Sequence, residues 1–133
     1  MSARLQDWRS RLAAWLASIA REPFAYGSHD CALFAAGAIE ALTGEDAAQD
    51  WRGKYRTLQG GLKLLRRSGY ADHLALARAR FPLTQNPRAG DLALVPVPDG
   101  VALGVVQGAL VYVPAEIGWG LVPREAAIEF LEV

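Results

Sequence analysis

Residues 27–44 read GSHDCALFAAGAIEALTG and carry the pattern that decides the fold. A turn at Gly27 leads to Asp30, whose carboxylate is suited to accept the unpaired N–H groups of a helix start. Small apolar residues follow, and Gly44 supplies the left-handed conformation that commonly ends a helix. The pattern predicts a buried helix that neighbouring elements can approach closely.

The single cysteine of the chain, Cys31, falls on the first turn of this predicted helix. A helix start carries unpaired N–H groups and the positive end of the helix dipole, and both favour a thiolate. A cysteine in such a place has a pKa of about 3.5 to 7.5, against about 8.5 for a free thiol. Free cysteine is also among the most buried residue types. Two interpretations of Cys31 stay open, a reactive thiolate and a small side chain that fills space.

The chain has 133 residues and a formal net charge of zero, which predicts one domain with one core. A neutral chain has no broad basic face for nucleic acid or anionic lipid, so we expect no nucleic-acid partner and no membrane insertion. Its one cysteine makes no internal disulfide, and no His/Cys cluster has metal-ligand spacing, so we expect no metal and no other cofactor. Charged residues precede any apolar run, which favours folding in the cytoplasm.

Trp51 and Tyr55 alternate with Arg52, Lys54 and Arg56. Stacking aromatic residues beside basic ones can bind single-stranded nucleic acid. Since the chain as a whole is neutral, we interpret this stretch as a solvated loop held by its two aromatic residues.

Three further helices are indicated by apolar spacing and capping residues. Apolar residues from 5 to 19 recur at three- and four-residue steps, which predicts an amphipathic helix. Thr57 is placed to cap a helix that ends at Gly69, and Asp72 to cap another over 74–80.

From Gly90 onward, short runs rich in valine and leucine are separated by glycine and proline, which predicts strands. These runs cover residues 91–97, 101–107, 109–113, 119–122 and 128–133. Helices over about 1–81 followed by strands over about 90–133 predict an α+β domain, with N-terminal helices packed on a small antiparallel sheet or half-barrel.

The order of these pieces resembles a known family. The similar segments are YGSHDC at 26–31, AGDL at 89–92, LGVV at 103–106 and YRT at 55–57. They are similar to the NlpC-type papain-like cysteine peptidases, several of which are tail components of bacteriophages. The resemblance spans residues 22–113. It implies a single papain-like (NlpC-like) domain over 1–133 with Cys31 as the candidate nucleophile.

The chain departs from this family at the catalytic base. NlpC-type enzymes carry that base as a histidine opening a His-Val-Gly-Ile pattern, and the corresponding run here begins with Ala102. The third polar group of the family falls on or near Val113. A nucleophilic thiol needs an imidazole within hydrogen-bond reach and a group that orients the imidazole. By this comparison two of the three groups are absent.

The two histidines of the chain are the remaining candidates for a base. His29 lies two residues before Cys31, where its ring could fold back toward the sulfur or point into solvent, and it is the candidate base. His73 is expected to be a surface residue beside the cap of the last helix. Asp30 is assigned to the cap of the central helix, not to the chemistry.

Two functions of different classes follow. The first is a bacteriophage or prophage tail-tip or tail-assembly protein, made in the bacterial cytoplasm, located in the virion and bound to other tail-tip and baseplate proteins. The second is an active cysteine peptidase or amidase that cleaves peptidoglycan stem peptides, with N–H groups near Ala32 as oxyanion donors. The missing strand histidine favours the first function.

Hydrophobic residues make up 52% of the chain, and four are tryptophans. An excess of apolar surface indicates a contact with a partner, where aromatic side chains dominate the energetics. Trp8, Trp15 and Trp119 are the candidate docking residues. The alternative is that they complete the core.

Overall fold

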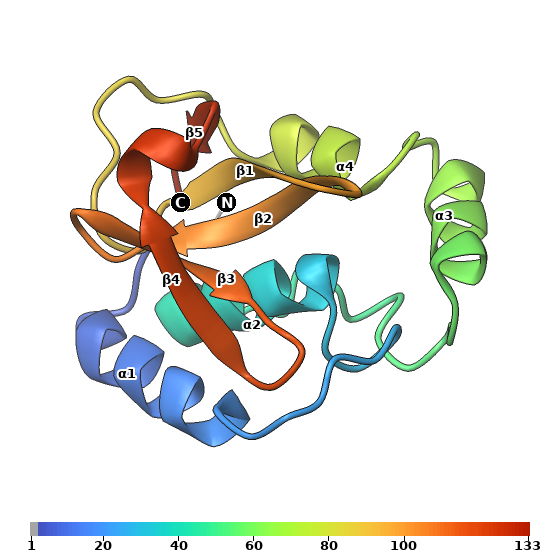
Figure 1. The fold of residues 1–133 in the computed structure, drawn as a ribbon, viewed down its shortest axis with the longest axis horizontal. Helices are drawn as coiled ribbons and strands as arrows, with labels where there is room; N and C mark the ends of the chain where they lie inside the picture. The colour runs from blue at the N-terminus through green and yellow to red at the C-terminus, as the bar shows by residue number, and fades with distance from the viewer. Residues whose placement is uncertain (1–2) are drawn as a thin grey trace.

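A computed structural model describes residues 3–133, in which four helices precede a five-stranded antiparallel sheet (Figure 1). The helices are α1 (Trp8–Ile19), α2 (Cys31–Thr43), α3 (Leu58–Arg67) and α4 (His73–Arg80). The strands are β1 (Leu92–Val97), β2 (Gly100–Val106), β3 (Leu110–Pro114), β4 (Trp119–Pro123) and β5 (Glu129–Leu131), with a 3-10 turn, η1 (Arg124–Ala126), before β5. The predicted α+β class and the order of helices before strands are confirmed. No helix in residues 3–133 combines the length and apolar character needed to cross a bilayer.

The sheet has the strand order β4-β3-β2-β1-β5, with every neighbouring pair antiparallel. The first strand pairs with β2 along its whole length, so that Leu94 lies opposite Leu103 and Val95 opposite Ala102. The pairing of β2 with β3 is limited to Val105 and Val106. Within the described residues, the first half of β2 therefore has no partner strand on its β3 side.

The two faces of the sheet bury different side chains. One face packs against the helices in the main core and includes Leu92, Leu94, Leu103, Val105 and Leu131. The other face carries a second cluster, formed by Ala93, Val95, Val106 and Val111. Side chains alternate between faces along a strand. Ala102, opposite Val95, therefore lies on the face turned away from the helices.

The central helix α2 is buried along most of its length, as its sequence predicts. The Asp30 carboxylate accepts the Leu33 N–H at 2.9 Å, which caps the helix start. Gly44 ends the helix with φ of 83° and donates its N–H to Glu40 O. A side chain at Gly37 would overlap the Trp15 indole, so the small residues of α2 allow α1 to pack closely.

The three candidate docking tryptophans pack against the main core. The Trp15 ring lies 5.0 Å from the Phe34 ring, centroid to centroid, and the Trp119 indole N–H donates to Leu16 O at 2.9 Å. Trp8 lies in contact with a guanidinium group 4.4 Å from its ring centroid, that of Arg4. Of the two interpretations from sequence, the structure supports the one in which these residues complete the core.

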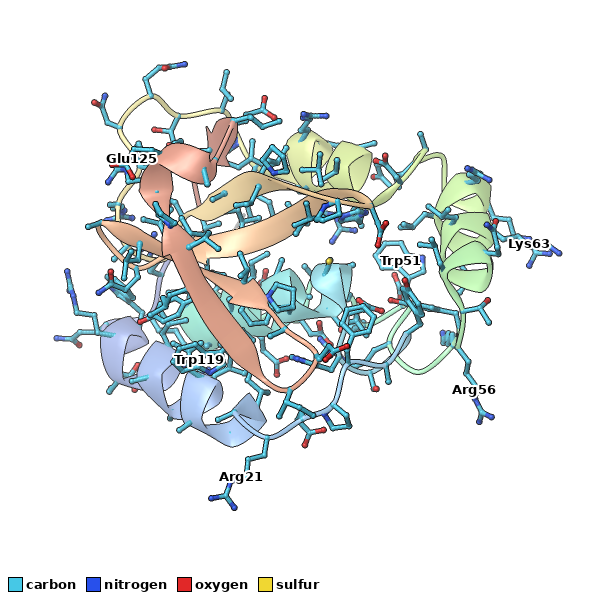
Figure 2. The ribbon with its side chains drawn as sticks, in the orientation of Figure 1. Arg21, Trp51, Arg56, Lys63, Trp119 and Glu125 are labelled. Atoms are coloured by element: carbon cyan, nitrogen blue, oxygen red, sulfur yellow. The ribbon has the colours of Figure 1, made fainter. Side chains whose placement is uncertain are left out.

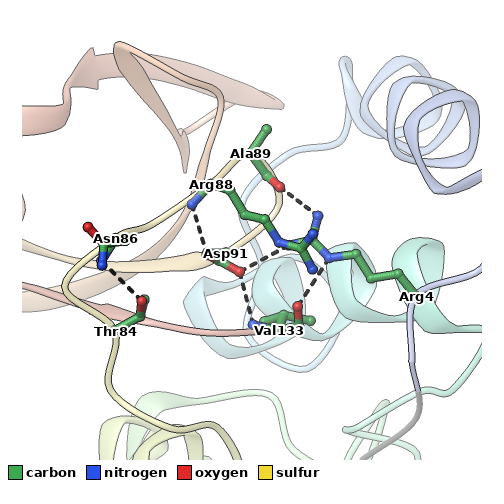
Figure 3. Close-up of polar contacts among 7 residues, drawn as sticks. All are labelled: Arg4, Thr84, Asn86, Arg88, Ala89, Asp91 and Val133. Atoms are coloured by element: carbon green, nitrogen blue, oxygen red, sulfur yellow. Dashed lines mark hydrogen bonds and ion pairs between the residues drawn. The ribbon is translucent and has the colours of Figure 1, made fainter.

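A buried ion pair joins the two ends of the described chain (Figure 3). One Asp91 oxygen accepts from Arg4 Nη2 and from the Val133 N–H, both at 3.0 Å, and the other accepts the Arg88 N–H at 2.9 Å. Arg4 also donates to Ala89 O at 2.7 Å and to Val133 O at 3.1 Å. The side chains of Arg4 and Asp91 are only 6% and 1% exposed, so this charge pair depends on its internal partners. The aspartate that opens β1 is thus a structural tie.

Candidate functional site

The Asp30 carboxylate organises the loop before α2. Besides the Leu33 N–H on one oxygen, its other oxygen accepts the Gly27 N–H at 3.0 Å and the Tyr55 hydroxyl at 2.5 Å. Burial, followed by the bond to this carboxylate, raises the pKa of Tyr55, so the hydroxyl stays protonated and donates. With three donors on it, Asp30 holds the loop, the helix start and Tyr55 together.

Cys31 is half-buried at the start of α2. Burial raises the pKa of its thiol, and the negative charge of Asp30 raises it further, while a hydrogen bond from the Leu103 backbone offsets part of the rise. Desolvation and a nearby like charge both disfavour the thiolate. The expectation of a lowered thiol pKa, drawn from the helix start alone, is therefore wrong. At neutral pH the Cys31 sulfur is a protonated thiol.

His29 is buried, and its contacts lie on the turn between β3 and β4. Its Nε2 lies 2.8 Å from Gly118 O, and because a carbonyl only accepts, Nε2 carries the proton. The ring also meets Phe34 edge-on, with 6.3 Å between ring centroids. In the described part of the chain, the printed contacts of the His29 ring do not include Cys31, and the ring does not point into solvent. The geometry gives no support to His29 as the base for Cys31.

His73 is half-buried, so its expected place on the surface is wrong. Its Nε2 lies 3.2 Å from Val101 O on β2, and Leu103, two residues on, is the backbone partner of Cys31. Both side chains therefore approach the same edge of β2. Two strand residues span about 6.6 Å, more than twice a hydrogen-bond length. The imidazole is thus bonded to the strand and not to the thiol.

The strand position assigned to the base by the family resemblance does not face Cys31. Ala102 points to the sheet face away from α2, and the adjacent residues that face the helices, Val101 and Leu103, are apolar. Val113, at the position of the third group, packs with the second cluster on that far face. The alternation of strand side chains was the signal in the sequence that indicates this. Beside Cys31, β2 offers no side chain that could act as a base.

An apolar pocket of about 70 Å³ lies between α2, α3, α4 and the loop that precedes α3. Most of its wall is made of small or apolar residues, among them Ala32, Ala35, Ala36, Ala47, Ala48, Gly61, Leu65, Ala77 and Leu103. Its polar groups belong to Tyr55, His73 and Arg80. Sequence reasoning missed this pocket, although small residues on α2 and on the segments packed against it were the available signal.

Within residues 3–133, no group of three or more His, Cys, Asp or Glu side chains is placed to hold a metal ion. A family model described as a domain of unknown function (DUF6950) matches residues 3–133. No curated protein and no solved structure matches the chain. The family match covers every described residue and supplies no activity.

Proposed function

The chain belongs to the DUF6950 family, a domain of unknown function, and for it we propose a structural role as a protein of an NlpC-like, papain-like fold without working catalytic groups. Its place is the tail tip, or tail assembly, of a bacteriophage. The fold assignment is supported by a cysteine-bearing helix start against an antiparallel sheet whose first strand opens at Asp91. The location rests on the resemblance of the sequence to phage tail-region proteins.

One observation carries the proposal: each candidate catalytic group is committed to another task. Asp30 holds three donors, and His29 donates to Gly118 O. The thiol of Cys31 is kept protonated by burial and by the charge of Asp30. A cysteine peptidase needs a thiolate beside an imidazole that takes its proton. This arrangement instead favours a scaffold that contributes surfaces to an assembly.

Incubating the purified protein with peptidoglycan is expected to release no stem-peptide fragments above the blank, and Cys31→Ala is expected to give the same result. Alanine is well suited to the small-residue helix α2, so Cys31→Ala should lower the free energy of unfolding by only about 1 to 2 kcal/mol. Fragment release by the wild-type protein that is lost in Cys31→Ala would instead establish the active cysteine peptidase.

The structural role is tested in phage particles. Removing the protein is expected to block tail formation or adsorption, whereas Cys31→Ala, at normal levels of folded protein, is expected to leave infectivity unchanged. Infectious particles formed without the protein would contradict a structural role. Loss of infectivity in Cys31→Ala alone would show that the sulfur has a chemical task.

A further inference from the structure

Positive charge is concentrated in one stretch of this neutral chain. Residues 51–71 contain six basic residues and no Asp or Glu, so the rest of the chain carries the balancing excess of acid. Arg52 is paired with Asp46 at 2.9 Å. The other five are exposed, and none forms an ion pair in the described part of the chain. We call these five the basic rim: Lys54, Arg56, Lys63, Arg66 and Arg67.

The basic rim borders the apolar pocket. Helix α3 stands at the edge of the molecule (Figure 1), and Arg56 and Lys63 point outward beside it (Figure 2). Tyr55 lines the pocket between Lys54 and Arg56 of the rim, and Leu65 lines it directly before Arg66. A hollow with apolar walls thus lies next to unpaired positive charges.

We propose that the pocket and the basic rim together bind an acidic segment of a partner protein, which inserts one aliphatic side chain into the pocket. This inference rests on the proposed assembly role and names the chemistry of the partner. The pocket of about 70 Å³ lies between the roughly 30 Å³ occupied by a water molecule and the roughly 150 Å³ of a cavity that binds benzene. An aliphatic side chain of a few carbons suits that size.

Two other classes of partner fit less well. Single-stranded nucleic acid needs aromatic faces on which bases can stack, but the Trp51 ring is covered by the Arg80 guanidinium 5.6 Å from its centroid. The Tyr55 ring packs on Gly61 of α3. A membrane-surface helix presents a broad apolar face, and Leu58 is the α3 leucine that is exposed, at 50%. Unpaired charge around a small apolar pocket therefore favours an acidic polypeptide.

The test is a fluorescence anisotropy titration with a labelled glutamate-rich peptide that carries one leucine. Binding is expected to weaken as salt rises and to weaken by about tenfold or more when serine replaces the leucine. The double variant Lys63→Glu/Arg66→Glu is expected to lose about tenfold or more in affinity. The matched control is Arg21→Glu, an exposed basic residue after α1, which should bind like the wild type.

A second variant tests the pocket itself. Ala36→Leu places a larger side chain in the pocket and is expected to abolish the advantage of the leucine peptide over the serine peptide, in protein whose circular dichroism shows it folded. Tighter rim-dependent binding of an RNA oligonucleotide, or of vesicles of anionic lipid, would overturn the inference in favour of that partner. Absence of peptide binding would also overturn it, while the phage-particle experiment would still judge the structural role separately.

Discussion

Replacing Asp91 with alanine is expected to lower the free energy of unfolding by about 3 to 5 kcal/mol. The change leaves the buried Arg4 guanidinium without its counter-charge and leaves the N–H groups of Arg88 and Val133 without their acceptor. Small domains are stable by only about 5 to 15 kcal/mol, so much of the protein would be unfolded at moderate temperature. Urea unfolding followed by circular dichroism measures the loss.

Two controls separate the ion pair from a general effect of losing an aspartate. Asp99 is exposed in the turn between β1 and β2, and Asp99→Ala should change stability by less than about 0.5 kcal/mol. Replacing Arg4 and Asp91 together with methionine and leucine removes the charge along with its partner and should recover much of the loss. A loss below about 1 kcal/mol in Asp91→Ala would show that the tie between the chain ends contributes little.

Gly27→Ala is expected to destabilise the protein by roughly 3 to 5 kcal/mol. Gly27 has φ of 88°, a conformation that side chains other than glycine rarely adopt, and an added Cβ would overlap the Tyr55 carbonyl oxygen. Because Gly27 N–H and the Tyr55 hydroxyl both donate to Asp30, moving the loop to relieve the overlap would also disturb the start of α2. Thermal and urea unfolding measure the effect.

The matched control is Gly53→Ala. Gly53 also has a positive φ, 75°, but a Cβ there would meet open space. This variant should lose only the backbone strain, about 1 to 2 kcal/mol. Equal losses in the two variants would show that the contact with Tyr55 is not the cause of the larger effect.

The sequence predicts the elements of this fold well where a local signal exists. Asp30, Thr57 and Asp72 each cap a helix through the side-chain oxygen that the capping pattern predicts. The glycine- and proline-bounded runs after Gly90 each become a strand. These signals are local, because a cap or a turn depends on residues within a few positions of one another.

The candidate site was less predictable because its chemistry depends on contacts between distant residues. Asp30 was identified as a cap, but its charge beside Cys31 acts together with burial, which a helix-start argument does not include. The bond between His73 and Val101 joins residues from separate elements, and no spacing indicates it. The faces of the tryptophans likewise follow from packing, since composition does not tell a core aromatic from a docking one.

The central claim is that Cys31 is not a working nucleophile, and the pH dependence of its alkylation by iodoacetamide tests this most directly. The chain has one cysteine, so the rate reports this thiol alone. The raised pKa predicts a rate that is low at neutral pH and reaches its midpoint above about 8.5, the ordinary value for a thiol. Asp30→Asn, which removes the adjacent charge, should move the midpoint down. A wild-type rate already at its plateau at pH 7, with a midpoint below about 7, would contradict the claim and indicate an activated thiolate.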